Sequence, residues 1–247
     1  MQRKILSLAT FSTLAPLAAL ATLALSATFS HAQGQPGKAI AARECPANAP
    51  FLSADALKKA GFDLPAFKRY CYTDAAGSHA LLLGEKQDLP FAEELLSSAI
   101  RASLYRVEPD NTLVQEWSIR DFADKDEAGV NFRSKLIELA DIDGDGLVDP
   151  VLVYRFFNQK DAEHIDDDDF VGRIKLVTFH KGSKATIHAV TGHFDGERKT
   201  TANSTYFALP KPVQQHLVKK MTAMDAAGQF GFDNSYGYEP RKERARR

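Results

Sequence analysis

Four aspartates at regular spacing are the residues of this chain that most clearly indicate chemistry. Asp141, Asp143, Asp145 and Asp149 stand at positions one, three, five and nine of the segment Asp-Ile-Asp-Gly-Asp-Gly-Leu-Val-Asp. Calcium is a hard cation that takes several oxygen ligands, and a tight turn directs alternate side chains inward. Gly146 stands where such a turn is sharpest. The segment therefore predicts a calcium site formed by the four carboxylates and the backbone carbonyl of Leu147.

Two other interpretations of this segment need comparison. Without a metal it is an ordinary aspartate- and glycine-rich turn, in which four unneutralised carboxylates would repel one another at close range. An EF-hand requires a bidentate glutamate at position twelve and a helix on each side of the loop. Position twelve here is Leu152, within an apolar run. Apolar segments at 136–140 and 151–154 instead predict a strand on each side of the turn.

Other candidate sites are less specific. Asp166, Asp167, Asp168 and Asp169 form an acidic run that is either a solvated loop or a second cation site. Acid–base pairs are conceivable at His164 with Asp161 or Glu163, and at His188 or His193 with Asp195. The sequence lacks H-E-x-x-H, G-x-S-x-G and G-x-x-x-x-G-K motifs and paired C-x-x-C motifs. No catalytic residue is therefore assigned.

The first 32 residues have the pattern of an export signal. Residues 1–4 are basic, residues 5–29 are apolar, and Ser30-His31-Ala32 places small residues at the two positions that a signal peptidase reads. We predict cleavage after Ala32 and a periplasmic or secreted location. The alternative is an uncleaved N-terminal membrane anchor, because about 20 apolar residues can span a bilayer.

The composition of the remaining chain excludes some classes of function. Losing Arg3 and Lys4 changes the formal net charge from −1 to about −3 (−1 − 2), which gives no sign of nucleic-acid binding. The hydrophobic content of the full chain, 44%, is enough for a core in one domain. No membrane span is expected after the signal is cleaved.

The two cysteines, Cys45 and Cys71, both follow the signal. An even pair in an exported protein usually forms a disulfide, which we predict here. Closing this loop would stabilise the fold by roughly 3–4 kcal/mol. A reactive thiol or a metal-binding pair is the alternative, but no nearby histidine supports it.

The rest of the chain predicts mainly strands. We expect a flexible lead-in at 33–50, a β-rich globular domain at 51–228 and a disordered basic tail at 229–247. Helices are expected at 54–60, 88–98 and 212–227. Strands are expected at 67–73, 79–83, 99–107, 113–122, 173–180, 185–191 and 205–209. Trp117 is expected to anchor the core, and Gly182 to begin a type II′ turn that places His188 opposite Val177.

The turn and its surroundings resemble known families. The segment from Asp141 to Asp149, followed by Pro150-Val-Leu-Val-Tyr154, is similar to calcium loops of the FG-GAP and VCBS type, in which aspartates hold calcium and a strand follows. The sequence contains no second copy, so a propeller is not expected. The chain also resembles exported bacterial proteins of the M949-type surface-polysaccharide family, whose activity is not established. The resemblance lies in the order of three features: an aromatic strand with Gly77, a strand with Trp117, and then this turn.

Together these patterns predict one α+β domain that is mainly β. We expect an antiparallel sheet or sandwich of about seven to nine strands with a few flanking helices. The expected function is that of an exported, calcium-stabilised binding or structural protein, with a cell-envelope glycan or a protein as partner. The alternative is a hydrolase acting on cell-envelope glycans, which would require two carboxylates in a cleft.

Overall fold

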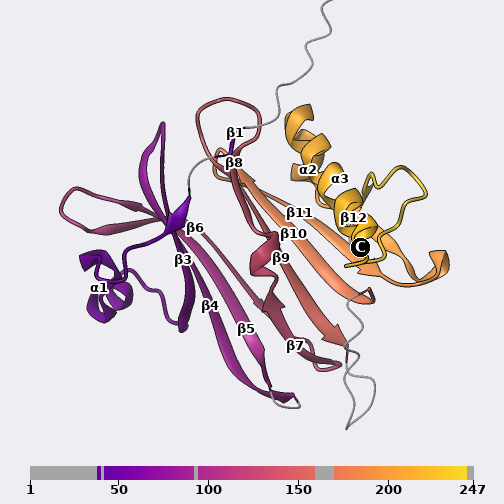
Figure 1. The fold of residues 1–247 in the computed structure, drawn as a ribbon, viewed down its shortest axis with the longest axis horizontal. Coiled ribbons are helices and arrows are strands. Elements are labelled where there is room, and N and C mark those ends of the chain that lie inside the picture. The colour runs from indigo at the N-terminus through magenta and orange to yellow at the C-terminus, as the bar shows by residue number, and fades with distance from the viewer. Residues whose placement is uncertain (1–37, 40–41, 92–93, 159–169, 244–247) are drawn as a thin grey trace, which may run out of the picture. The chain divides into compact units, whose positions relative to one another are not determined.

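The computed structural model describes residues 38–39, 42–91, 94–158 and 170–243 (Figure 1). The predicted signal peptide, the acidic run from Asp166 to Asp169 and His164 lie outside these residues. Within the described part, no helix combines the length and the apolar character needed to cross a membrane.

The described strands form one sheet, whose members are β1 (Lys38–Ala39), β2 (Arg43–Glu44), β3 (Ala66–Asp74), β4 (Gly77–Phe91), β5 (Glu94–Val107), β6 (Leu113–Phe122), β7 (Glu127–Phe132), β8 (Glu138–Asp141), β9 (Asp149–Asn158), β10 (Gly172–His180), β11 (Ser183–Thr191), β12 (Lys199–Ala202) and β13 (Arg241–Lys242). The α-helices described are α1 (Ala54–Lys59), α2 (Ser204–Ala208) and α3 (Lys211–Ala226). Short 3-10 turns lie at Pro50–Leu52, Ser134–Leu136 and Asp195–Glu197.

The sheet order is β13-β12-β11-β10-β9-β7-β5-β4-β3-β2, with β6 paired to β5 and β8 paired to β1 and β9. Strands β12 and β13 run parallel, while the other pairs are antiparallel. This confirms the predicted single α+β domain, mainly β. The predicted strand number is too low, because very short strands such as β1, β2 and β13 carry little sequence signal.

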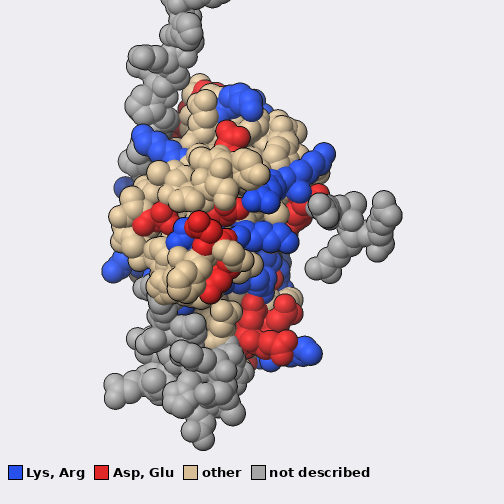
Figure 2. All heavy atoms as spheres, turned by 90° about the vertical axis from the view of Figure 1, so that its right-hand side faces the viewer, with Lys and Arg blue, Asp and Glu red and all other residues tan. Residues whose placement is uncertain are grey.

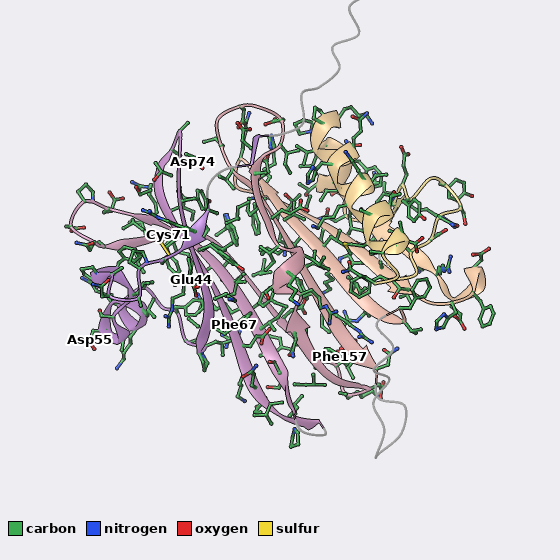
Figure 3. All side chains as sticks on the ribbon, viewed as in Figure 1. Glu44, Asp55, Phe67, Cys71, Asp74 and Phe157 are labelled. Atoms are coloured by element: carbon green, nitrogen blue, oxygen red, sulfur yellow. A yellow bond between two sulfur atoms is a disulfide. The ribbon has the colours of Figure 1, made fainter. Side chains whose placement is uncertain are left out.

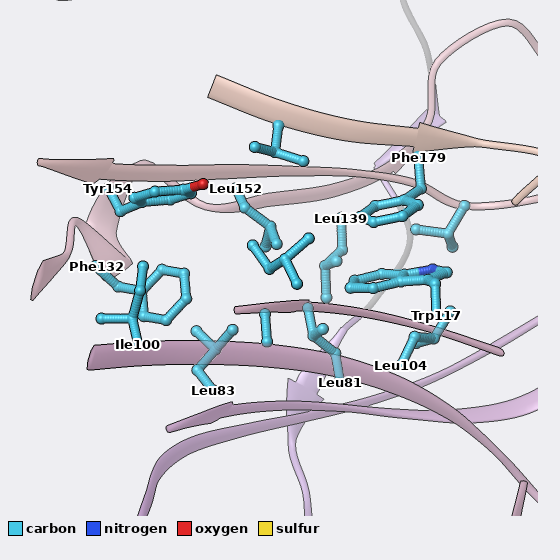
Figure 4. Packing of buried hydrophobic residues seen from close by; sticks show 14 of the residues in the cluster. Leu81, Leu83, Ile100, Leu104, Trp117, Phe132, Leu139, Leu152, Tyr154 and Phe179 are labelled. Carbon is cyan, nitrogen blue, oxygen red and sulfur yellow. The ribbon is translucent and has the colours of Figure 1, made fainter. Parts of the chain in front are cut away.

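The first core cluster lies where the two halves of the sheet face each other. Strands lie on both sides of the buried side chains in Figure 4. Trp117 of β6 stacks on Phe179 of β10, with ring centroids 3.8 Å apart and planes inclined by 6°. Burial of such large rings removes much apolar area from water. Trp117 is therefore a core anchor, as expected.

The second core cluster joins α3 to the opposite face of β9, β10 and β11. Figure 1 shows α3 crossing this part of the sheet. Val213, Leu217, Met221 and Met224 form the buried side of the helix, because residues three and four apart share one helix face. They pack against Ile174 and other strand residues of the same cluster. The predicted 212–227 helix is thus confirmed.

The disulfide between Cys45 and Cys71 is present, with an S–S distance of 2.06 Å (Figure 3). It connects the segment before α1 to β3. The helix α1 begins as predicted at Ser53, whose side chain accepts a hydrogen bond from the Ala56 N–H. A third core cluster beneath this segment includes Phe62 and Tyr105.

Two predicted elements are wrong. The described residues of the predicted 88–98 helix, 88–91 and 94–98, belong to strands instead, because the ends of β4 and β5 pair with each other, for example at Leu89 and Leu96. Residues 205–209 do not form a strand: the Asn203 side chain accepts a hydrogen bond from the Tyr206 N–H and begins the helix α2.

The turn between β10 and β11 also differs from its prediction. Lys181 and Gly182 both have positive φ, at 49° and 76°, so the turn is type I′ rather than type II′. The central residues of the turn are Lys181 and Gly182, one position before the predicted Gly182 and Ser183. This displacement shifts the pairing by two residues, so that His188 lies opposite Lys175 instead of Val177.

Much of the segment predicted as a disordered tail is instead packed against the domain. Phe230 and Phe232 are fully buried in the second core cluster. The Tyr238 hydroxyl donates a hydrogen bond to Asp225 Oδ2 over 2.7 Å. Burial of two aromatic rings offsets the conformational entropy lost on ordering the segment. The domain therefore extends at least to Lys242 in β13.

Candidate metal centre

The 141–149 turn connects β8 and β9, which pair directly beside it through Ala140 and Asp149. The flanking elements are therefore strands, as predicted. Leu152 is fully buried in β9, so the side chain at position twelve faces the core. An EF-hand is excluded by both observations.

Asp141 holds the turn in shape. Its Oδ1 accepts a hydrogen bond from the Gly144 N–H at 2.8 Å, and its Oδ2 accepts one from the Gly146 N–H at 2.9 Å. Gly144 and Gly146 have φ of +81° and +88°, a region that favours glycine. The two glycines thus let the backbone wrap around the first carboxylate.

Three of the predicted ligands come together. Asp141, Asp143 and Asp149 each present a carboxylate oxygen within 4.8 Å of the other two. Asp143 is 12% exposed, and its Oδ1 is buried without a hydrogen-bond partner among the described residues. A buried acceptor left without a partner is destabilising. The arrangement fits a cation, which would give this oxygen a partner and reduce the repulsion among the three carboxylates.

Asp149 is the most buried of the three and has partners on both oxygens. Its Oδ2 accepts a hydrogen bond from the Ile142 N–H at 3.0 Å, and its Oδ1 lies 2.8 Å from His180 Nδ1. Burial raises the pKa of Asp149, and the hydrogen bond with His180 opposes this shift. Asp149 therefore joins the carboxylate cluster to the end of β10.

His180 is a residue of the site that the sequence analysis missed. The antiparallel register of β9 and β10 pairs Val151 with Thr178. Extending that register by two residues places His180 opposite Asp149. A correct pairing of the two strands was the only signal that would have found it.

His180 also belongs to a second possible ligand set. Asp143, Asp145 and His180 present ligand atoms within 4.8 Å of one another. A set with an imidazole nitrogen suits zinc better than calcium. Asp143 is common to both sets.

Asp145 lies at the rim of the turn. Its Oδ1 accepts a hydrogen bond from the Leu147 N–H at 2.8 Å, and its Oδ2 lies 3.0 Å from Lys181 Nζ. Burial would raise the pKa of Asp145, but these two contacts outweigh burial and lower it. Leu147 is half-buried, and its carbonyl stays a predicted ligand.

Asp74 is the second residue missed. It ends β3, near the turn in Figure 3, and its Oδ2 accepts a hydrogen bond from the Val148 N–H at 3.1 Å. The neighbouring Ala75 N–H donates to the Gly146 carbonyl at 2.9 Å. The tip of the β3–β4 hairpin thus holds the turn from outside.

The remaining sequence candidates are dispersed. His188 lies on β11, with its Nε2 3.5 Å from Glu243 Oε1. The His193 ring stacks on Phe170, and Asp195 Oδ1 lies 3.4 Å from Arg198 Nη1. None of these contacts joins two of the predicted acid–base partners.

Comparison with known proteins gives no further identification. No family model, curated protein or solved structure matches this chain.

Proposed function

We propose that this chain is an exported protein whose β-rich domain is stabilised by one calcium ion in the 141–149 turn. The observation that supports the proposal most strongly is the buried Asp143 Oδ1. It has no hydrogen-bond partner in the described part of the chain and belongs to a cluster of three carboxylates. Oxygen-only ligands favour calcium. The expected ligands are Asp141, Asp143, Asp145, Asp149 and the carbonyl of Leu147.

The role proposed for calcium is structural. The turn connects β8 to β9 and is held by the tip of the β3–β4 hairpin through Asp74. A bound ion would fix these segments against one another. Extracellular modules bind calcium at roughly 10⁻⁴–10⁻³ M, which suffices where calcium is plentiful.

The proposal includes a periplasmic or secreted location after cleavage at Ala32. The disulfide between Cys45 and Cys71 supports it, because disulfides persist mainly in oxidising compartments. The function proposed for the domain is binding within the cell envelope or outside the cell.

We do not extend the proposal to glycan hydrolysis. Asp74 and Glu116 are the acids beside a cavity next to the turn. Both oxygens of Asp74 already accept backbone hydrogen bonds, from the N–H groups of Ala76 and Val148. Protonating Asp74 as a general acid would disrupt this arrangement, so the pair favours binding over proton transfer.

A thermal melt of the mature chain tests the proposal. With calcium at about ten times its Kd, the free energy of unfolding should rise by about 1.4 kcal/mol. The melting temperature should then rise by about 3–5 °C, and a chelator should abolish the increase. Asp143→Asn should remove the calcium response, because an amide supplies a weaker neutral ligand.

Asp126→Asn is the matched control, because it removes an equal charge from an exposed turn residue. This variant should keep the full calcium response. An equal calcium response in Asp143→Asn and wild type would exclude the proposed site. A larger increase with zinc than with calcium would assign the site to the set that contains His180.

A further inference from the structure

A cavity of about 320 Å³ adjoins the candidate metal centre without including its carboxylate cluster. Leu147 and Val148 of the turn form one wall, and Trp117 and Phe179 form another. The polar lining includes His79. Its volume lies at the lower end of the usual range for small-molecule sites.

The strongest sign of a ligand in this cavity is His79. Its side chain is 2% exposed, and its Nδ1 is buried with no hydrogen-bond partner from the residues that the structure describes. The nearest acid to this nitrogen is Asp74, whose Oδ1 lies 3.5 Å away, while Glu116 Oε2 lies 3.4 Å from Nε2. Buried polar groups in folded proteins generally have a partner. A ligand in the cavity can supply one.

The charges around the cavity disfavour anions and apolar molecules. Asp74 and Glu116 contribute two carboxylates, which repel an anion. Among the described residues of the lining, Lys181 is the only Lys or Arg, and it lies 3.0 Å from Asp145. An apolar molecule would leave the carboxylates and His79 desolvated without compensating hydrogen bonds, which is costly.

A neutral polyhydroxyl ring fits better than an ammonium ion. A hydroxyl both donates and accepts, as does a neutral imidazole, whereas an ammonium group only donates. The Asp74 carboxylate already accepts two backbone hydrogen bonds, so its charge is partly compensated. One indole face of Trp117 is covered by Phe179, which leaves less aromatic surface for a cation.

We propose that this cavity binds a single neutral sugar residue, with His79, Asp74 and Glu116 as hydrogen-bonding partners and Trp117 as part of the apolar wall. This inference rests on the binding role in the proposed function but does not require calcium. The carboxylates accept hydroxyl protons, and His79 Nδ1 donates to or accepts from a ring hydroxyl. The cavity is partly open to solvent, so it can accept either a free sugar or the terminal sugar of a longer glycan.

Trp117 is the only tryptophan of the chain, so its fluorescence reports directly on the cavity. We would titrate the mature protein with glucose, galactose and N-acetylglucosamine up to about 50 mM, since a small ring with few hydrogen bonds binds weakly. At least one sugar should produce a saturable change. Glu116→Gln should weaken this binding at least about fivefold, because a charge-assisted hydrogen bond becomes a neutral one.

Glu108→Gln is the matched control. Glu108 and Glu116 are 28% and 31% exposed, and both contact Arg106, but Glu108 does not line the cavity. This variant should bind sugar like the wild type. Glu116 is preferred to the buried His79 for the test because a substitution of His79 would perturb the core around it.

Three results would overturn the inference: no saturable change with any of the sugars, equal affinity in Glu116→Gln and wild type, or a saturable response to choline but not to sugars. Running each titration with calcium and with chelator separates this test from the metal proposal. Sugar binding with calcium or with chelator supports the proposed sugar site. The proposed metal site is tested separately, by the dependence of the melting temperature on calcium.

Discussion

Asp143 differs from the other aspartates of the turn in what its oxygens contact. Asp141 uses both oxygens to hold the backbone of the turn, and Asp149 uses both for Ile142 and His180. Asp143 keeps one buried oxygen that no described residue contacts through a hydrogen bond. At the scale of single residues, this oxygen is therefore the best indicator of a cation.

The sequence predicted part of this arrangement. Alternating aspartates and glycines determine the local turn, so Asp141, Asp143 and Asp149 were found from spacing alone. His180 and Asp74 were not, because they lie 31 and 74 residues from their hydrogen-bond partners in the turn. The pairing of β9 with β10 brings His180 close to Asp149, and the approach of the β3–β4 hairpin brings Asp74 close to the turn.

Two glycines allow a test of the turn at the residue scale. An alanine at Gly144 or Gly146 would adopt a left-handed φ, which costs about 1–2 kcal/mol. At Gly146 the added Cβ would also lie 3.3 Å from the Ala75 Cβ, whereas at Gly144 it meets nothing within 4 Å. Gly146→Ala should therefore lower the free energy of unfolding by about 1 kcal/mol more than Gly144→Ala.

Urea unfolding of both variants, in the presence of chelator, measures this difference. Chelation removes any contribution from a bound ion. Equal losses of stability would mean that the contact between the turn and the β3–β4 hairpin does not constrain Gly146.

Several elements support the turn together. Strands β8 and β9 form its two ends, the β3–β4 hairpin contacts it through Asp74 and Ala75, and the β10–β11 hairpin contacts it through His180 and Lys181. The strand before the turn is also tied to α3. Glu138 of β8 accepts hydrogen bonds from Lys220 and His216 of this helix, at 2.5 Å and 2.6 Å.

The contact between Glu138 and α3 predicts a dependence of stability on pH. Burial would raise the pKa of Glu138, but the hydrogen bonds from His216 and Lys220 outweigh it and lower the pKa to about 2. A lowered pKa in the folded state means that the stabilisation is fully present above the unfolded value of about 4.5 and is lost as pH falls towards about 2. Because Glu138 is 38% exposed, solvent screening limits the effect to about 1 kcal/mol or less.

Glu138→Gln should therefore lose less stability than the wild type when the pH is lowered from about 5 to about 2.5. Urea midpoints measured across this range give the comparison. Glu44→Gln, which removes an exposed carboxylate of β2, should follow the wild-type curve. Parallel curves for Glu138→Gln and wild type would show that this contact contributes no pH dependence.

At the scale of elements, the sequence was most informative where packing agreed with local preference. The α3 helix has an apolar stripe and was predicted almost to the residue. Residues 88–98 have helix-start signals at Asp88 and Pro90, but pairing between β4 and β5 overrides them. The segment with Thr205 is apolar enough for a strand, yet the hydrogen bonds at Asn203 begin a helix instead.

The whole domain combines a sheet that encloses one core, a helix that covers a second and a disulfide that fixes the third. Both signs of charge are interspersed on the face shown in Figure 2. This agrees with the near-neutral composition, from which no nucleic-acid partner was expected. The mainly-β class was predictable from alternating patterns, but the strand order was not, because residues distant in sequence determine it.

The most direct test of the account is isothermal titration of the chelator-treated mature protein with calcium. One calcium ion should bind per chain with a Kd of roughly 10⁻⁴–10⁻³ M. The binding should be lost in Asp143→Asn and retained in Asp126→Asn. No calcium binding by the wild type at concentrations up to about 10 mM, or unchanged binding in Asp143→Asn, would contradict the proposed calcium site.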